Sequence, residues 1–455
     1  MLWGGRFGAG PDPKMFALSA SIDVDIVLLG ADVAATKAHA RVLQAAGLLD
    51  ADEVGAVDAT LDELLATWRA GELGPGDGDE DVHSLVERSL TESLGETGRK
   101  IHAGRSRNDL VATDVRLYCK DAAGELAGAV TELIEALAVQ AEAHTETVMP
   151  GFTHMQPAQP VSAGFHLLAH GFALLRDLGR IESAGQAADV SPLGAGALAG
   201  TTLPLDAKVA AEHLGFGAVF DNAMDAVSDR DFACDLLYAT ALLGVHLSRL
   251  AEEIVLWASP VFGFARLPDE WSTGSSMMPQ KRNPDMAELI RGRSGPAIGD
   301  LMAMLTLLKG LPLAYDRDMQ EDKELLFRSV GRALGCARGM TAMVSGIVFD
   351  EDRLARVAEE GAMWATDLAE ILVGRGVSFR AAHETVGHLV ALVEDSGDPL
   401  DATALTAAHD AFEVDDLEVV DASRGMRARL SHGGTAPERV QEQLAALRSR
   451  LASGG

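Results

Sequence analysis

The sequence predicts an all-α protein of three helical domains, with a bundle of long helices in the middle one. Strict alternation of apolar and polar residues is almost absent, whereas apolar residues at helical spacing are common. In the clearest stretch, Leu126, Val130, Leu133, Ile134 and Leu137 form one apolar stripe. A chain of 455 residues is also longer than a single hydrophobic core usually supports, which favours several domains.

The longest predicted helix runs from about residue 109 to 148 and stops before Pro150-Gly151. At 1.5 Å per residue, this helix would be roughly 60 Å long. Pro296 is a candidate kink inside a later helix. The segment 435–438 has the spacing of a capping box before the last helix. The other predicted helices span residues 161–188, 226–259, 285–309, 318–348 and 437–451.

Shorter helices on either side of the bundle divide the chain into predicted domains at residues 1–108, 109–358 and 359–455. The predicted helix at 226–259 is apolar over much of its circumference, so we expect it to be buried on several sides. Long helices of this kind would expose much apolar surface in a monomer, and we therefore expect a homo-oligomer.

The formal charge of −30 is expected to repel nucleic acid and anionic membranes. We recognise no signal peptide and no apolar run that is long enough to span a membrane. Cys119, Cys234 and Cys336 are far apart and have no metal-ligand spacing, so we expect reduced, buried thiols and a cytoplasmic protein. The excess of acids over bases is similar to that of salt-adapted proteins, which is a hypothesis about habitat.

Polar segments at predicted helix boundaries are the candidates for chemistry. The first is Gly104-Arg-Ser-Arg-Asn-Asp109, where two arginines at a helix N-terminus suit an anion. The alternative is an ordinary helix cap with solvated arginines.

The second segment, 151–160, contains His154, whose ordinary pKa suits a general acid or base. A structural histidine is the alternative. In the third, 274–284, Ser275 could act as a base if backbone N–H groups or a cation such as Lys281 stabilised its alkoxide. The alternative there is a mobile surface loop.

Together, in this order, the three segments resemble the fumarase/aspartase superfamily, and 274–284 resembles its GSSxMPxKxNP fingerprint. Within the superfamily, the sequence is most similar to argininosuccinate lyases and their relatives, the delta-crystallins. The resemblance covers nearly the whole chain. The stretches that carry this narrower resemblance are residues 2–7, 104–109, 191–200 and 313–323.

The resemblance implies a role for each matching residue. Ser275 would be the base, His154 would act on the acid side, Glu288 would orient His154, and Lys281 would meet the carboxylate beside the abstracted proton. Arg107 would lie at the fumarate-moiety end. Further substrate contacts are implied for Ser21, Asn108, Thr153, Asn283, Tyr315, Gln320 and Lys323.

The implied activity is reversible elimination of fumarate from argininosuccinate to give arginine, in arginine biosynthesis, without a cofactor or a metal. The family assembles each site from three subunits of a homotetramer around a core of twenty helices. The alternatives are another fumarate-releasing lyase, acting on adenylosuccinate or a substituted aspartate, and a non-catalytic crystallin-like protein.

The sequence departs from the family pattern at a few positions. Leu110 replaces a common glutamine, and Asp316-Arg317 replaces Asn-Lys; Leu110 and Asp316 could affect substrate affinity. Met155 and Arg282 are further departures, and none of these residues is assigned to chemistry. His83 is expected to be structural rather than part of the site.

Overall fold

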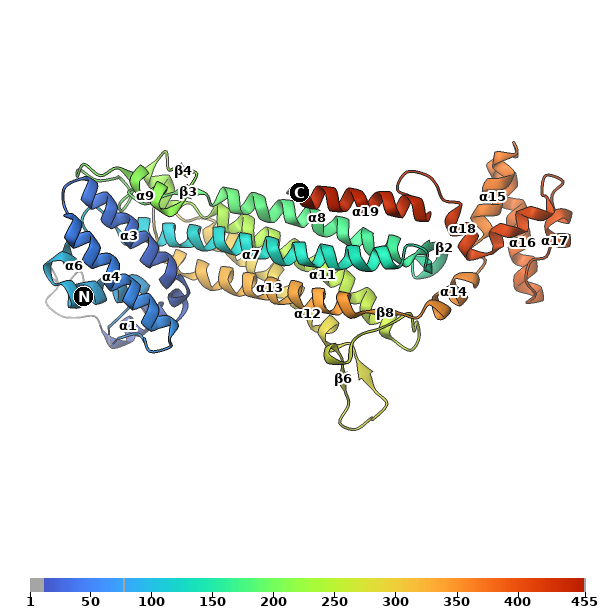
Figure 1. The fold of residues 1–455 in the computed structure, drawn as a ribbon, viewed down its shortest axis with the longest axis horizontal. Coiled ribbons are helices and arrows are strands. Elements are labelled where there is room, and N and C mark those ends of the chain that lie inside the picture. Colours follow the sequence, from blue (N-terminus) through green and yellow to red (C-terminus); the bar gives the residue numbers. More distant parts are fainter. Residues whose placement is uncertain (1–11, 77, 454–455) are drawn as a thin grey trace. The chain divides into compact units, whose positions relative to one another are not determined.

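The computed structural model describes residues 12–76 and 78–453, and Figure 1 follows them along the chain. Its contacts divide the chain into two compact units, each built from three stretches of sequence. The first unit comprises Met1–Ala127, Arg180–Leu242 and Gly295–Leu334, and the second comprises Gly128–Gly179, Leu243–Ser294 and Gly335–Gly455. The stretch 2–7 lies outside the described residues, and the three domain boundaries stay a prediction.

Long helices dominate, which confirms the predicted all-α class. Each passes from one unit into the other. The side chains of the predicted stripe on the longest helix are 0% exposed from Leu126 to Leu137, which confirms the periodicity argument. Within the described residues, the helices longer than 20 residues are α7 (Arg107–Ala143), α8 (Ala163–Ala187), α11 (Asp231–Ala258), α12 (Asp285–Leu308) and α13 (Asp322–Gly346).

The first unit adds short helices whose starts follow capping chemistry. Asp50 and Glu53 form a capping box, and the Asp81 side chain accepts a hydrogen bond from the Ser84 N–H group. The short elements of this unit are α1 (Pro13–Ser19), α2 (Ile22–Asp25), η1 (Ile26–Leu28), α3 (Leu29–Ala45), α4 (Ala51–Arg69), α5 (Val82–Leu94), α6 (Glu96–Lys100), β3 (Val190–Ser191), α9 (Ala207–Leu214), β4 (Ala218–Val219), α10 (Ala223–Ser228) and η3 (Arg317–Glu321).

The second unit contains antiparallel strand pairs β1 with β2, β5 with β8 and β6 with β7. Trp364, Leu368, Leu372 and Val386 belong to a buried cluster formed by its C-terminal helices. Its short elements are β1 (Val148–Thr153), β2 (Gln156–Ser162), β5 (Ala265–Arg266), η2 (Asp269–Trp271), β6 (Thr273–Gly274), β7 (Arg282–Asn283), β8 (Val348–Phe349), α14 (Glu351–Glu359), α15 (Ala365–Gly374), α16 (Phe379–Ser396), α17 (Ala402–Ala408), η4 (Val414–Val420), α18 (Ala422–Arg427) and α19 (Pro437–Ala452).

Two predicted elements differ in the structure. The helix expected at 226–259 is interrupted at Asp229 and Arg230, and the buried Arg230 guanidinium donates to Asp322 at 2.7 Å. The capping box expected before α19 is wrong. Thr435 Oγ1 instead accepts the N–H of Ser162 at 2.9 Å, and Ala436 is the N-cap.

Two expectations about composition can be compared with the described residues. None of the helices in residues 12–76 and 78–453 combines the length and apolarity that crossing a bilayer would require. Cys119 and Cys336 are buried, as expected, whereas Cys234 is only partly buried, so the expectation of a buried thiol is wrong for Cys234.

Candidate active site

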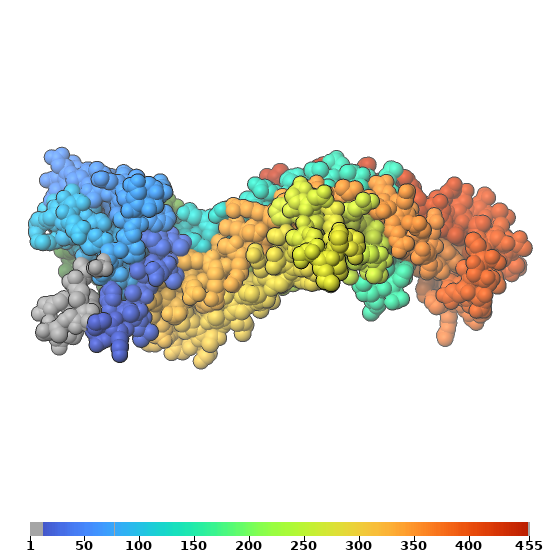
Figure 2. Space-filling model, turned by 90° about the horizontal axis from the view of Figure 1, so that it is seen from below, coloured from blue at the N-terminus to red at the C-terminus, as the bar shows by residue number. Residues whose placement is uncertain are grey.

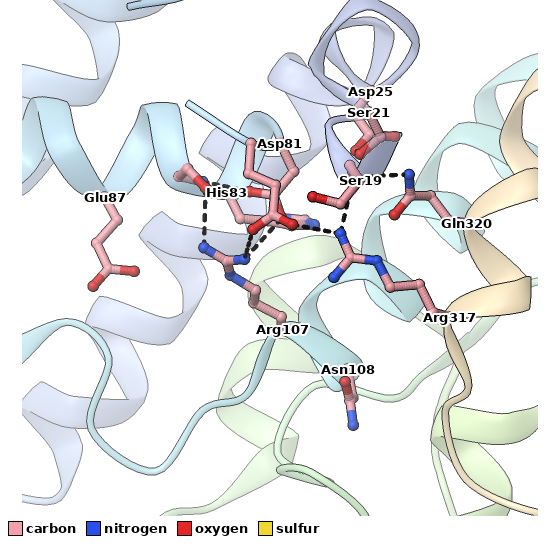
Figure 3. Close-up of polar contacts among 12 residues, drawn as sticks. Ser19, Ser21, Asp25, Asp81, His83, Glu87, Arg107, Asn108, Arg317 and Gln320 are labelled. Atoms are coloured by element: carbon pink, nitrogen blue, oxygen red, sulfur yellow. Dashed lines mark hydrogen bonds and ion pairs between the residues drawn. The ribbon is translucent and has the colours of Figure 1, made fainter. Parts of the chain in front are cut away.

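A cavity of about 230 Å³ in the first unit collects the predicted substrate-binding residues of that unit. Its walls come from the start of α2, the start of α5, the start of α7, and the segment from Tyr315 through η3 to the start of α13. Figure 3 shows several of these side chains converging on the same space. The lining residues are Ser21, Asp25, Asp81, His83, Arg107, Asn108, Val111, Tyr315, Arg317, Gln320 and Lys323.

Ser21 is held at the start of α2 by backbone and side-chain contacts. Its N–H group donates to the Glu80 carbonyl at 2.8 Å, and its hydroxyl donates to the Asp25 carboxylate. Burial raises the pKa of Asp25, although Lys323 and the Ser21 hydroxyl oppose the rise. The Ser21 hydroxyl is therefore oriented beside a buried carboxyl group and faces the cavity.

Arg107, the first residue of α7, is oriented by the acidic loop before α5. Its guanidinium lies 3.1 Å from an Asp81 carboxylate oxygen and 3.4 Å from a Glu80 oxygen, and it donates to Ser84 Oγ at 3.0 Å. Figure 3 shows Arg107 and Arg317 both directed toward this acidic group. The predicted alternative of solvated arginines is wrong for Arg105, which is 8% exposed and donates to a buried threonine.

Asp109, near the start of α7, accepts hydrogen bonds from a glycine-rich loop. Its buried carboxylate accepts the N–H groups of Gly194 at 3.1 Å and Gly196 at 2.9 Å. Gly196 has a φ of 62°, and a Cβ atom there would lie 2.9 Å from the Gly200 carbonyl oxygen, so the close turn requires glycine. Asn108 donates to Ala197 O at 3.0 Å, which orients its side chain at the rim of the cavity.

Lys323 also lines the cavity, and its side chain is 2% exposed. Burial alone would lower its pKa, but Asp322 and Asp25 outweigh burial and raise the pKa of Lys323. The ammonium group donates to Asp322 Oδ1 at 2.9 Å. Ala314, with a φ of 72°, precedes Tyr315 and turns the chain there. The site thus holds a protonated, nearly buried lysine.

In the second unit, His154 lies at the exposed tip of the β1–β2 hairpin. From the sequence, a helix boundary and no strands were predicted here. Thr153 pairs with Gln156, so His154 and Met155 form a two-residue connection with φ values of 54° and 60°. Such left-handed conformations are costly for residues other than glycine and are often found at functional sites.

Ser275 lies in the loop between β6 and β7, which extends away from the helices of its unit (Figure 1; yellow in Figure 2). Its Oγ accepts the backbone N–H groups of Met277 at 3.2 Å and Met278 at 3.1 Å. Two N–H donors on one hydroxyl oxygen would stabilise negative charge on that oxygen. The backbone N–H group of Lys281 donates to the Met278 carbonyl oxygen at 3.0 Å, which forms a turn within the loop.

Asn283 belongs to β7, and Glu288 lies in the first turn of α12. Within the single chain, the Glu288 carboxylate is 4.0 Å from Arg291 on the same helix. Among the hydrogen bonds and ion pairs of the described residues, none joins His154 to Glu288 or to the Ser275 loop. The orienting role of Glu288 stays a prediction.

A family model described as Lyase matches residues 5–299, and one described as Argininosuccinate lyase C-terminal matches residues 362–426. The argininosuccinate lyase of Frankia casuarinae is 52% identical over 453 residues, which are 99% of this chain and 98% of that protein. The argininosuccinate lyase of Acidothermus cellulolyticus is also 52% identical, over 99% of this chain and 94% of its own.

The chain belongs to the argininosuccinate lyase family. It is therefore an enzyme of the carbon–nitrogen lyase class. Among solved structures, an EDDS lyase is 27% identical with a TM-score of 0.84, over 98% of this chain and 91% of that one. A class II fumarase from Schistosoma mansoni, 17% identical with a TM-score of 0.75 over 92% of this chain and 93% of that one, shows the same fold.

Two departures from the argininosuccinate lyase pattern can now be located. Leu110 is 2% exposed and packs in an apolar cluster with Ala35 and Leu193. It belongs to the core and is not among the cavity-lining residues, so the structure gives it no direct contact with that space. Arg317 does line the cavity, where it donates to the Ser19 carbonyl at 2.9 Å and pairs with Glu80.

Five residues that line this cavity were not predicted from the sequence, namely Asp25, Asp81, His83, Val111 and Arg317. The expectation that His83 is structural rather than part of the site is wrong in that His83 lines the cavity. The His83 Nδ1 atom forms a hydrogen bond with Asp32, and the side chain is 6% exposed. The cluster of acids around residues 79–81, just before α5, was visible in the sequence as part of an acidic loop. Nothing in the sequence showed that this loop would face Arg107.

Proposed function

We propose that this chain catalyses the reversible cleavage of argininosuccinate into arginine and fumarate, in arginine biosynthesis. The observation that carries the proposal is 52% identity to argininosuccinate lyases over nearly the whole of both chains. The wide separation of Cys119, Cys234 and Cys336 in the sequence, without metal-ligand spacing, supports the further proposal of a cytoplasmic enzyme.

In the proposed reaction, the Ser275 alkoxide removes a proton from the carbon beside a carboxylate. The electron pair of that C–H bond forms the double bond of fumarate, and the C–N bond to the guanidino group breaks. The transient dianion needs donors where its charge develops. The N–H groups at Ser275 Oγ support this role for the serine, and the ammonium of Lys281 would meet the carboxylate.

The leaving guanidino nitrogen needs a proton, which we assign to His154, oriented by Glu288. Thr153 and Asn283 would contact the substrate beside these groups. Arg107, Asn108, Tyr315, Gln320, Lys323 and Ser21 would hold it in the cavity of the first unit. The substrate carries three carboxylates, so cations such as Lys323 would matter most in a chain with a charge of −30.

We further propose a homotetramer in which different chains contribute to one site. Within the single chain, the turn that carries His154 is exposed. Ile298, Met302 and Leu305 form an exposed apolar stripe on one face of α12, at 45%, 57% and 47% exposure. Contact with other copies would cover this stripe and bring the hairpin turn to a neighbour's cavity.

The first experiment measures fumarate release from argininosuccinate by wild type and by Ser275→Ala. We expect the substitution to lower kcat by at least about 10²-fold, roughly 3 kcal/mol of transition-state stabilisation. Ser276→Ala is the matched control, because it removes the adjacent hydroxyl, and it should retain most activity. Equal turnover by Ser275→Ala and wild type would contradict the role of Ser275, and an inactive wild type would favour the crystallin-like alternative.

A second experiment tests whether sites are shared between chains. Ser275→Ala and His154→Asn proteins, each inactive alone, are unfolded together and refolded as a mixture. If Ser275 and His154 of one site come from different chains, some sites in mixed oligomers carry neither substitution, and activity returns. No recovery in oligomers that are verified by mass to be mixed would contradict shared sites.

The second candidate function is cleavage of a different substituted aspartate. The EDDS lyase neighbour, at 27% identity and a TM-score of 0.84, is the observation that favours it. The 52% identity to an argininosuccinate lyase is higher than the 27% identity to the EDDS lyase, so it favours argininosuccinate as the substrate. Parallel assays with argininosuccinate, adenylosuccinate and EDDS would separate the candidates, and we expect fumarate from argininosuccinate alone.

A further inference from the structure

A second cluster of ionisable side chains lies in the second unit, among residues to which the proposed reaction assigns no role. His166 and His170 are four residues apart on α8, so both imidazoles lie on the same face of the helix. Glu253, on α11, reaches both of them. Its Oε2 atom is 2.6 Å from His166 Nε2 and 2.7 Å from His170 Nε2.

The three side chains converge in the way that a small cation requires. Their ligand atoms, two imidazole nitrogens and one carboxylate oxygen, lie within 4.8 Å of one another. Zinc with bonds of about 2.0–2.1 Å holds tetrahedral ligand atoms about 3.4 Å apart. The distances from Glu253 Oε2 to the two Nε2 atoms, 2.6 and 2.7 Å, would therefore have to lengthen by about 0.7–0.8 Å to admit an ion. The side chains are 28%, 13% and 33% exposed, so an ion can reach them from solvent in this chain.

The surroundings orient these groups. Both Nε2 atoms face the same Glu253 oxygen, Oε2. The Trp257 ring packs edge-to-face on the His166 ring at 5.2 Å, which restrains the imidazole.

We propose that His166, His170 and Glu253 form a binding site for a divalent transition-metal cation of the zinc class, which would link α8 to α11. Two histidines and one glutamate are a known ligand set for zinc, with water in the fourth position. Imidazole nitrogens select such metals over Mg²⁺ and Ca²⁺, which prefer oxygen ligands. Binding moves each Nε2 proton to Nδ1 or releases it to solvent, so the imidazoles bind as neutral ligands. The site is independent of the proposed lyase activity.

The test is zinc binding to the full-length protein after chelator treatment and dialysis. Equilibrium dialysis and titration calorimetry with ZnCl₂ measure the number of ions per chain and their affinity. Wild type should bind one more zinc ion per chain than His166→Gln/His170→Gln, and excess MgCl₂ should not compete. The control, His383→Gln/His388→Gln, removes two exposed histidines from α16 and should match wild type.

A further variant and a direct measurement keep the test decisive if the double variant folds poorly. Glu253→Gln preserves the shape of the side chain and should weaken zinc binding by about tenfold or more, since a ligand matters at least as much as its supporting groups. Crystals of wild type soaked in ZnCl₂ should show an anomalous peak about 2.0–2.2 Å from both Nε2 atoms. Zinc binding of equal number and affinity in wild type and the His166/His170 variant, or no such peak, would overturn the proposal.

Discussion

The buried imidazole of His39 couples the stability of the fold to pH. Burial, with Arg105 nearby, lowers the pKa of His39 to about 3 from its ordinary 6.5. Its Nε2 lies 3.0 Å from the Ala103 carbonyl, which fits a neutral ring that donates there. Below pH 6.5 the unfolded chain binds a proton at His39 and the folded chain does not. Stability from this residue is therefore present above pH 6.5 and is lost as the pH falls toward 3.

We predict that His39→Gln flattens the pH dependence of the free energy of unfolding. The residue contributes at most about 1.4 kcal/mol per pH unit between its unfolded and folded pKa values. Urea unfolding of both proteins at about pH 7, 6 and 5 measures the slope, which a general loss of packing would not change. His383→Gln, on the exposed face of α16, serves as control. Parallel slopes for wild type and His39→Gln would contradict the prediction.

Long fingerprints and family positions are what allowed candidate site residues to be assigned from the sequence. Ser275 and Lys281 were identified because a specific pattern of neighbours surrounds them, and Ser21 and Lys323 because they match family positions. The sequence did not predict which side chains contact each other across the fold. Thr435 was expected to cap its own helix, yet it accepts from Ser162, 273 residues away in sequence. Local spacing carries no information on such a partner.

At the scale of elements, the hairpin turn at His154 and Met155 stores strain that substitution can reveal. Both residues have positive φ, which costs roughly 1–2 kcal/mol for residues other than glycine. We predict that Met155→Gly raises the thermal midpoint. The free energy of unfolding should rise by up to about 1 kcal/mol after glycine's larger unfolded-state entropy is subtracted. Met155→Val should lower it, because a β-branched side chain fits positive φ poorly.

Both midpoints should be measured at one protein concentration, because the stability of an oligomer depends on concentration. The two variants shorten the same side chain, so their difference reports backbone conformation more than lost contacts. A midpoint for Met155→Val equal to or above that of Met155→Gly would show that the turn is not strained in the assembled protein.

The long helices were predictable because each carries an apolar pattern over many turns, and α7 and α8 begin and end within a few residues of expectation, apart from the earlier end of α7 at Ala143. The two-residue strands such as β6 and β7 were not, because they are too short for alternation to be recognised. The longer strands β1 and β2 contain Pro150, Pro157 and Pro160, which disguise a strand in the sequence. The break at Asp229-Arg230 depends on the buried pair of Arg230 and Asp322, which is a tertiary contact. Short-range patterns therefore predict the scaffold better than the loops that carry the chemistry.

The whole molecule carries a formal net charge of −30 on 455 residues, and this negative charge dominates its electrostatics. Most of this charge is on exposed side chains, whereas cations such as Lys323 and Arg107 gather at the cavity. Mutual repulsion of surface carboxylates opposes the compact state, and a site for a tricarboxylate has to overcome the same field. Salt screens the repulsion, because the Debye length falls from about 10 Å at 0.1 M to about 3 Å at 1 M.

We therefore predict that the thermal midpoint rises as KCl increases from about 0.05 to 1 M. The variant Glu384→Gln/Glu394→Gln/Asp398→Asn removes three charges from exposed positions in and after α16, and its midpoint should depend less steeply on salt. Sorbitol at equal osmolality separates screening from general exclusion effects, since an uncharged solute leaves the repulsion intact. The same midpoint in dilute buffer and in 1 M KCl would mean that the acidic surface does not limit stability, and the hypothesis of salt adaptation would lose its physical basis.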